Sequence, residues 1–174
     1  MYIYGSAADI SMSSNGFIQG NASSLSVRHL GSSAAFISNI NSDGSIGNIS
    51  GLQTVGYGRL AISGVAEDCI LRGNGDQRIS MTILSGGLAK NTALNNNVAD
   101  LFILSGAVAS ATVVSGGSMF ISNGGMAVDT IVKTGTVQVS SGGTLCGSVQ
   151  IHSGAVVSAY SGPSVDFTLT DRTA

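Results

Sequence analysis

The stretch Thr82-Ile-Leu-Ser-Gly-Gly returns three more times along the chain, and this repetition decides the fold. Its later copies are Phe102-Ile-Leu-Ser-Gly-Ala, Phe120-Ile-Ser-Asn-Gly-Gly and Gln138-Val-Ser-Ser-Gly-Gly. A second phrase lies between these copies, as Thr112-Val-Val-Ser-Gly, Ile131-Val-Lys-Thr-Gly and Gln150-Ile-His-Ser-Gly. Internal periods of roughly 20 to 50 residues are typical of stacked-repeat architectures. The sequence therefore predicts a repeat protein.

The repeated phrases are typical of short strands that end in turns. They are rich in Val, Ile and Thr and close on glycine. A helix is disfavoured because no window carries apolar residues at helical spacing. Two apolar columns follow the period, at steps of roughly 19 residues for the first and roughly 18 for the second: Leu94, Val113, Val132 and Ile151, then Ile103, Ile121, Val139 and Val157.

The glycines also fall into columns, which predict the corners of each repeat. One column is Gly116, Gly135 and Gly154, with Asn97 in the preceding slot, and the Gly/Asn choice indicates positive φ. The other column is Gly86, Gly106, Gly124, Gly142 and Gly162. The longer arm between these columns predicts a third corner near Ser110, Asp129 and Gly147.

Three corners in each coil of about 19 residues leave three short strands, which would stack at ~4.8 Å as parallel sheets. The predicted fold is therefore all-β, a parallel β-helix (solenoid) of about nine coils. Residues 81–174 would form regular repeats of 18–20 residues. Residues 1–80 contain similar short phrases at less regular spacing. They are interpreted as irregular coils of the same helix, with a separate cap domain as the alternative.

Composition excludes several classes of protein. Only 9% of the residues are charged, the net charge is -2, and the basic residues are scattered, so no nucleic-acid footprint is present. No apolar run approaches the ~18 residues of a transmembrane helix, so this segment is not expected to enter a membrane. The first residues lack the basic and apolar regions of a signal peptide. We interpret the chain as a mature fragment with an added Met, with a cytoplasmic protein as the alternative.

The two cysteines are not expected to pair. Cys69 and Cys146 would lie about four coils apart, roughly 20 Å at ~4.8 Å per coil, whereas a disulfide requires Cα atoms within about 7 Å. Cys146 shares a register position with Val128, and we expect it to be a small buried hydrophobic residue.

No constellation of residues predicts catalysis. The densest charge cluster comprises Glu67, Asp68, Arg72, Asp76 and Arg78, and it is interpreted as a solvated loop. Asp129 and Lys133 contribute one charge of each sign near a corner, whereas cleavage of polysaccharides needs clustered carboxylates.

The histidines and the familiar site motifs lead to the same expectation. His152 is expected in the register of Val114 and Lys133, facing outward beside a turn. There is no metal-ligand spacing, phosphate loop or Ser/His/Asp order. We therefore expect no enzyme activity, no cofactor and no metal ion.

Phrases of the form Thr-x-Val-x-Ser-Gly-Gly, alternating with Val-x-x-Gly-Gly over residues 82–162, resemble the passenger repeats of AIDA-type self-associating autotransporter adhesins. The resemblance implies a right-handed β-helical passenger that is exported through an outer-membrane barrel absent from this sequence. It implies display on the bacterial cell surface, adhesion to host cells, autoaggregation and biofilm formation, with virulence as the consequence.

The same resemblance implies partners and modification sites. The partners would be passengers on other cells, the host cell surface and a bacterial protein O-heptosyltransferase. The implied O-heptose acceptors are the hydroxyl residues at the turns: Ser85, Ser105, Ser115, Thr134, Ser141 and Ser153. Hydrogen bonding within the turn is the alternative role of these side chains. Two alternative functions stay open, a β-helical polysaccharide-degrading enzyme and a trimeric phage tail fibre or spike.

Overall fold

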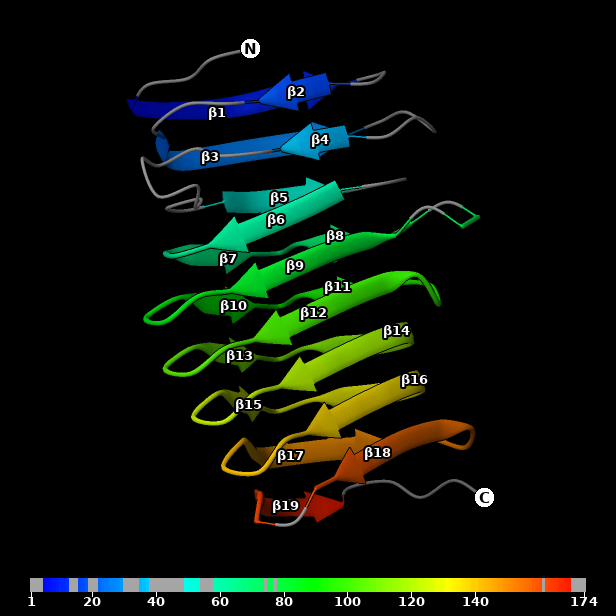
Figure 1. Ribbon diagram of the computed structural model, residues 1–174. Coiled ribbons are helices and arrows are strands. Elements are labelled where there is room, and N and C mark those ends of the chain that lie inside the picture. Colours follow the sequence, from blue (N-terminus) through cyan, green and yellow to red (C-terminus); the bar gives the residue numbers. More distant parts are fainter. Residues whose placement is uncertain are drawn as a thin grey trace.

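The chain winds into a solenoid whose parallel strands stack coil on coil, as the computed structural model shows (Figure 1). The structure describes residues 5–12, 16–18, 22–29, 35–37, 49–53, 58–73, 75–76, 78–160 and 162–169. All the assigned regular elements in these ranges are β-strands. The prediction of an all-β parallel solenoid is confirmed.

Each coil contributes strands to three stacks. The first stack holds β5 (Ile49–Gln53), β7 (Val65–Glu67), β10 (Leu88–Lys90), β13 (Val108–Ser110), β15 (Met126–Val128), the start of β17 (Thr144–Ile151) and β19 (Ser164–Leu169). The second holds β8 (Ile70–Leu71), β11 (Ala93–Leu94), the starts of β14 (Val113–Ile121) and β16 (Ile131–Val139), and the end of β17. The third holds β6 (Gly58–Ile62), β9 (Ile79–Ile83), β12 (Ala99–Ile103), the ends of β14 and β16, and β18 (Ala155–Ala159).

The N-terminal strands continue this parallel pairing. β1 (Gly5–Met12) pairs with β3 (Ala22–His29), and β3 pairs with β5. β2 (Gly16–Ile18) pairs with β4 (Ala35–Ile37). The division at residue 80 stays a prediction, as does the count of about nine coils, because both include residues outside the described ranges.

Coil length is close to the predicted period. The backbone register leads from Ala66 to Ala89, Ala109, Ala127, Leu145 and Val165, in steps of 23, 20, 18, 18 and 20 residues. The predicted repeat of 18–20 residues is therefore confirmed over the coils that follow Ala89. The longest step contains the long corner between β8 and β9.

Alternation along the strands places one side chain in two inside the coil. In β9 the pattern is Ile79, Met81 and Ile83 buried, with Ser80 and Thr82 partly exposed. Burying a Leu or Ile side chain fully contributes about 1.5–3 kcal/mol to folding. The interior is thus a continuous apolar line in which each coil packs on its neighbours.

The register corrects one member of each predicted apolar column. Val114, and not Val113, lies between Leu94 and Val132 in the buried column. Val139 pairs with Ala159, whereas Val157 pairs with Val137. Both errors have one cause, because coils of unequal length shift the register while the sequence columns assume a constant step.

The three predicted corners are present. Gly116, Gly135 and Gly154 have φ values of 121°, 95° and 87°. The third corner has positive φ at Asp129 (55°) and Gly147 (80°), and also at Asp68, Asn91 and Ala111. Ala111 takes the place predicted for Ser110, one residue later.

The Asn97 prediction was wrong, because this residue does not have positive φ. Five residues, 95–99, lie between Leu94 and Asp100, whereas three, 115–117, lie between their register partners Val114 and Ser118. A turn that is two residues longer reaches β12 without the left-handed residue that the glycine column uses.

The cysteines are free and far apart, as expected, but their environments differ from the prediction. Cys146 does pair in register with Val128, yet its side chain is only partly buried because Leu145 takes the inward position. Cys69 is the buried cysteine. Its burial raises the pKa of the thiol to about 12, the Asp68 charge adds to the rise, and a backbone hydrogen bond from Leu52 opposes it.

Candidate functional site: two hydroxyl edges

The predicted acceptor hydroxyls gather along two edges of the solenoid. Ser85, Ser105 and Ser141 lie at the turn between the third and first stacks, and Asn123 takes this place in the coil between Ser105 and Ser141. We call this line of four residues the glycine edge, because each residue directly precedes a glycine. All four side chains are exposed. The sequence therefore placed its first set of candidate residues correctly on the surface.

The glycine edge is held rigidly by the backbone. The amide of Gly86 donates to the carbonyl of Gly106 at 3.0 Å, and the amide of Gly106 donates to the carbonyl of Gly124 at 2.8 Å. The next two bonds run from Gly124 to Gly142 (2.9 Å) and from Gly142 to Gly162 (3.1 Å). These turns therefore continue the hydrogen-bonded ladder of the strands and do not interrupt it.

Glycine is needed here for two reasons. Gly106 and Gly124 have φ values of 74° and 72°, in the left-handed region. A Cβ atom on Gly106 would also lie 2.7 Å from the Ser85 Oγ atom, and one on Gly124 would lie 2.6 Å from the Ser105 Oγ atom. Each serine side chain thus occupies the space over the glycine of the next coil, which aligns the hydroxyls in one row.

The second edge lies between the second and third stacks, and we call it the Ser/Thr edge. It comprises Ser115, Thr134 and Ser153, and Ser115 pairs directly with Thr134. Thr134 and Ser153 are exposed, whereas Ser115 is partly buried. The six predicted residues therefore lie in two separate rows along the solenoid and do not form one site.

The predicted charge cluster is divided among different contacts. An Nη atom of Arg78 lies 3.6 Å from the Asp100 carboxylate, one coil away. The Asp68 carboxylate accepts a hydrogen bond from Asn91 at 3.1 Å. Burial raises the pKa of Asp100, and the Arg78 charge partly offsets this rise. The cluster contributes to contacts between coils.

The other predicted polar residues also lie at corners. The Asp129 carboxylate accepts a hydrogen bond from the Ser148 amide at 2.7 Å, while Lys133 is exposed. His152 follows Ile151, which pairs with Val132, so it shares the register of Lys133 as predicted. Val114 is not in this register, because it pairs with Val132. The Nε2 atom of His152 is buried and has no hydrogen-bond partner in the described part of the chain.

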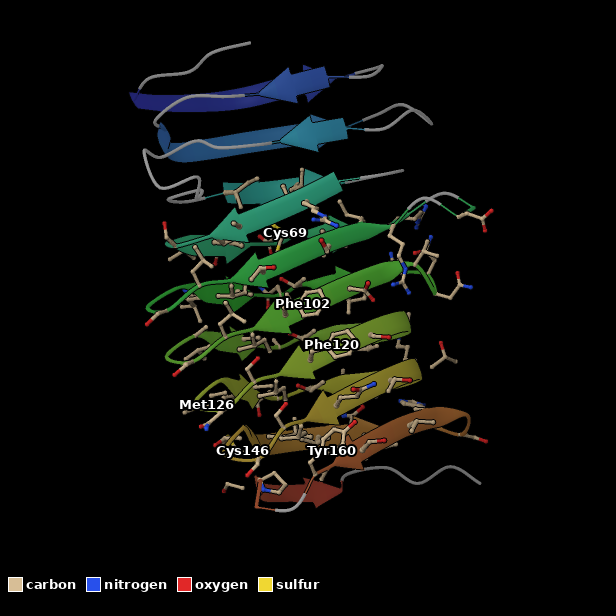
Figure 2. The ribbon with its side chains drawn as sticks, viewed as in Figure 1. Cys69, Phe102, Phe120, Met126, Cys146 and Tyr160 are labelled. Atoms are coloured by element: carbon tan, nitrogen blue, oxygen red, sulfur yellow. The ribbon has the colours of Figure 1, made fainter. Side chains whose placement is uncertain are left out.

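Two features of the structure were missed in the sequence. The rings of Phe102 and Phe120 stack on the near face of the third stack, on β12 and β14 (Figure 2). Both residues begin copies of the repeated phrase, so their alignment was the signal that could have revealed the pair. The second feature is a buried column of hydroxyl residues behind the third corner, made of Thr92, Thr112 and Thr130.

Taken together, these elements define the class as a parallel β-solenoid with hydroxyl-bearing edges. Comparison with family models, curated proteins and solved structures finds no match to this chain. Within the described ranges, no group of three or more His, Cys, Asp and Glu residues could hold a metal ion. No helix among the described residues is long and apolar enough to cross a membrane.

Proposed function

We propose that this chain is a segment of a surface-displayed bacterial adhesin, the passenger of an AIDA-type autotransporter. Its function would be adhesion to host cells and autoaggregation leading to biofilm. The observation that carries the proposal is the glycine edge, where backbone hydrogen bonds of 2.8–3.1 Å connect five successive turns. A solenoid connected in this way at both strands and turns resists bending, so it can hold its outer surface away from a cell.

The repetition of the coil supports adhesion through many weak contacts. Each coil adds a similar set of outward side chains to the same faces and edges. Contacts that are weak individually can together raise affinity by about 10²–10⁴ when they are linked on one scaffold. An adhesive function therefore needs no single deep pocket.

We further propose that Ser85, Ser105, Thr134, Ser141 and Ser153 accept O-linked heptose, with Ser115 as a less accessible sixth site. The exposure of the first five side chains supports this assignment. A bacterial O-heptosyltransferase would be the partner for this step, before export through an outer-membrane barrel. We also infer a right-handed winding, because parallel crossover connections are right-handed in about 98% of cases.

The first experiment displays the chain on the surface of a non-aggregating bacterium by fusion to a translocator barrel. We expect these cells to settle from suspension and to bind cultured host cells, whereas cells that display the barrel alone should do neither. Equal settling and binding by the two strains would overturn the adhesin proposal.

The matched test of modification is the intact mass of protein from its native host, where additions of one heptose each are expected. A single unmodified mass would remove the sugar from the proposal.

A further inference from the structure

The three aromatic side chains whose placement the structure describes all belong to the third stack. Phe102 and Phe120 lie on β12 and β14, on the near side of the solenoid, and Tyr160 directly follows β18 (Figure 2). Tyr160 is 59% exposed. The two phenylalanine side chains are partly exposed and point outward, because the alternate positions, such as Leu101 and Ile103, are buried in the core. Aromatic surface is therefore concentrated on this one stack.

Hydrogen-bonding side chains surround the two stacked rings. In the row of the rings, Thr82 pairs with Phe102 on one side, and Gln138 pairs with Phe120 on the other. The next outward row, two residues earlier on each strand, carries hydroxyls and one carboxylate: Ser80, Asp100, Ser118 and Thr136. Two residues along a strand correspond to ~6.6 Å, so this row lies directly beside the rings. The rings thus form an apolar centre within a polar rim.

The charged groups at this rim form a pair. An Nη atom of Arg78 lies 3.6 Å from the Asp100 carboxylate on the neighbouring coil. The Asp100 side chain is only 9% exposed, whereas that of Arg78 is 66% exposed. The carboxylate therefore holds an exposed guanidinium on the same side of the solenoid as Phe102, where its remaining N–H groups can donate to a ligand. The pair adds no net charge to the surface.

Three classes of partner suit this surface poorly. Nucleic acids and anionic glycans require clustered basic residues, whereas the third-stack segments 118–121 and 136–139 beside the rings are uncharged. An extended peptide requires a free sheet edge, but β12 is paired on both sides, with β9 and with β14. A lipid surface requires a broad apolar or cationic face, and the rim here consists mainly of hydroxyls and an amide.

A neutral sugar chain has the complementary chemistry. A pyranose ring carries C–H groups on its faces and hydroxyls around its rim, so it can cover an aromatic ring and form hydrogen bonds beside it at the same time. The hydroxyl of Thr82 and the amide of Gln138 can both donate and accept, as sugar hydroxyls do. The four register positions from Thr82 to Gln138 span about 14 Å at ~4.8 Å per coil. This length suits a short oligosaccharide that lies along the solenoid.

We propose that Phe102 and Phe120, with Arg78, Thr82 and Gln138 around them, form a binding site for a neutral glycan chain of the host cell surface. This inference rests on the proposed adhesive function and names the class of molecule that the chain binds on the host cell. Because the rings lie on an open sheet face, the dissociation constant for one oligosaccharide should be on the order of 1 mM. Many chains on one bacterium would combine such weak contacts into firm attachment.

NMR titration of the purified chain tests the site with neutral hexasaccharides built from glucose, mannose, galactose or N-acetylglucosamine. We expect at least one of them to bind, with its C–H protons shifted by the ring currents of the two phenylalanines. Phe102→Leu and Phe120→Leu keep an apolar side chain but remove the aromatic face, so each should raise the dissociation constant by about threefold to tenfold. The matched control Met126→Ala shortens an exposed apolar side chain on the first stack and should leave this constant unchanged. Circular dichroism and thermal unfolding check that all three variants fold.

Three results would overturn the proposal. The first is that no neutral hexasaccharide binds with a dissociation constant below about 10 mM. The second is that both ring variants bind the sugar as tightly as the wild type does. The third is that a heparin hexasaccharide binds more tightly than every neutral one and that added salt removes this binding, which would indicate an anion site at Arg78.

Bacteria that display the chain separate this inference from the proposed function. Removal of glycans from cultured host cells by glycosidases should lower the binding of bacteria that display the wild-type chain, and Phe120→Leu should lower binding to untreated host cells. If neither change lowers binding, the adhesin proposal stands, the glycan site fails, and a protein receptor is indicated. If the purified chain binds a hexasaccharide but the displayed chain attaches to no host cells, the glycan site stands and host-cell adhesion fails.

Discussion

Phe102 and Phe120 stack with their ring centroids 4.8 Å apart and their planes only 8° from parallel. This separation matches the spacing between neighbouring parallel strands. The pairing of β12 with β14 therefore places one ring over the other. Stacked residues on neighbouring coils can in this way contribute to the attachment of one coil to the next.

A double-mutant cycle measures that contribution. We expect Phe102→Ala and Phe120→Ala to be coupled by about 0.5–1.5 kcal/mol in the free energy of unfolding, beyond the area that each ring buries. Chemical denaturation of the wild type, both single variants and the double variant gives the coupling. Additive effects of the two substitutions would show that the rings are neighbours without energetic coupling.

The buried threonines predict a substitution that stabilises the protein. The Thr112 side chain is fully buried and its hydroxyl has no partner among the described residues. In the coil after Thr130 the equivalent inward residue is Val149, because Gln150 pairs with Ile131. Thr112→Val keeps the shape of the side chain and removes an unsatisfied hydroxyl. We therefore expect the free energy of unfolding, measured by thermal or denaturant unfolding, to rise by about 1 kcal/mol. The control Thr136→Val lies at a partly exposed, outward position of the third stack and should change stability by less than about 0.5 kcal/mol. A loss of stability in Thr112→Val would contradict this expectation.

Close contact between coils predicts that alanine substitutions at two glycines lower the stability by different amounts. A Cβ atom on Gly117 would overlap the carbonyl oxygen of Ala99, so Gly117→Ala must displace a strand. We expect a loss of about 3 kcal/mol, the upper part of the range for overpacking. At Gly154 a Cβ atom meets nothing within 4 Å, but φ is +87°. Gly154→Ala should therefore cost only about 1–2 kcal/mol, from the left-handed backbone. Equal losses in the two variants would contradict the larger steric cost expected at Gly117.

Asp100 predicts a pH dependence of stability. Burial raises its folded-state pKa above the usual value of 3.8, so the folded protein binds this proton more tightly than the unfolded chain does. The unfavourable contribution of the carboxylate is absent below pH 3.8 and develops as the pH rises through the folded-state pKa. We expect the free energy of unfolding of Asp100→Asn to rise relative to that of the wild type across this pH window. Above the window the difference between the two proteins should stay constant. Denaturant unfolding between pH 3 and 8 measures the difference, and a difference that declines with rising pH would show that the pair with Arg78 dominates.

The two thiols should react at very different rates with an alkylating reagent. Cys69 is buried and its thiol pKa is raised to about 12, so it carries almost no thiolate near neutral pH. Cys146 is partly exposed. In native protein we expect only Cys146 to be alkylated, and Cys146→Ser should leave no fast-reacting thiol, as read by mass spectrometry. Both thiols should react after unfolding in denaturant, which is the control for reagent access.

The sequence by itself determined the repeat, the class of fold and the corners. The positive φ of each turn requires glycine at Gly116, Gly135 and Gly154. The residue type alone therefore indicates where these turns lie. Short phrases that are rich in Val, Ile and Thr and close on glycine determined that the arms are strands. The exposed positions of Ser85, Ser105 and Ser141 followed, because a turn residue beside glycine faces the solvent.

Only the tertiary structure decided which residues meet between coils. Register steps between neighbouring coils vary from 17 to 25 residues, and a slip of one residue turns a side chain from the inside to the outside of a strand. For this reason Val114 replaces Val113 in the core. Cys146 keeps its predicted register with Val128, but both face outward because the neighbouring Ala127 and Leu145 are the buried residues. The contact of Arg78 with Asp100 depends on this same register, since corners of unequal length set where each chain segment enters the next strand.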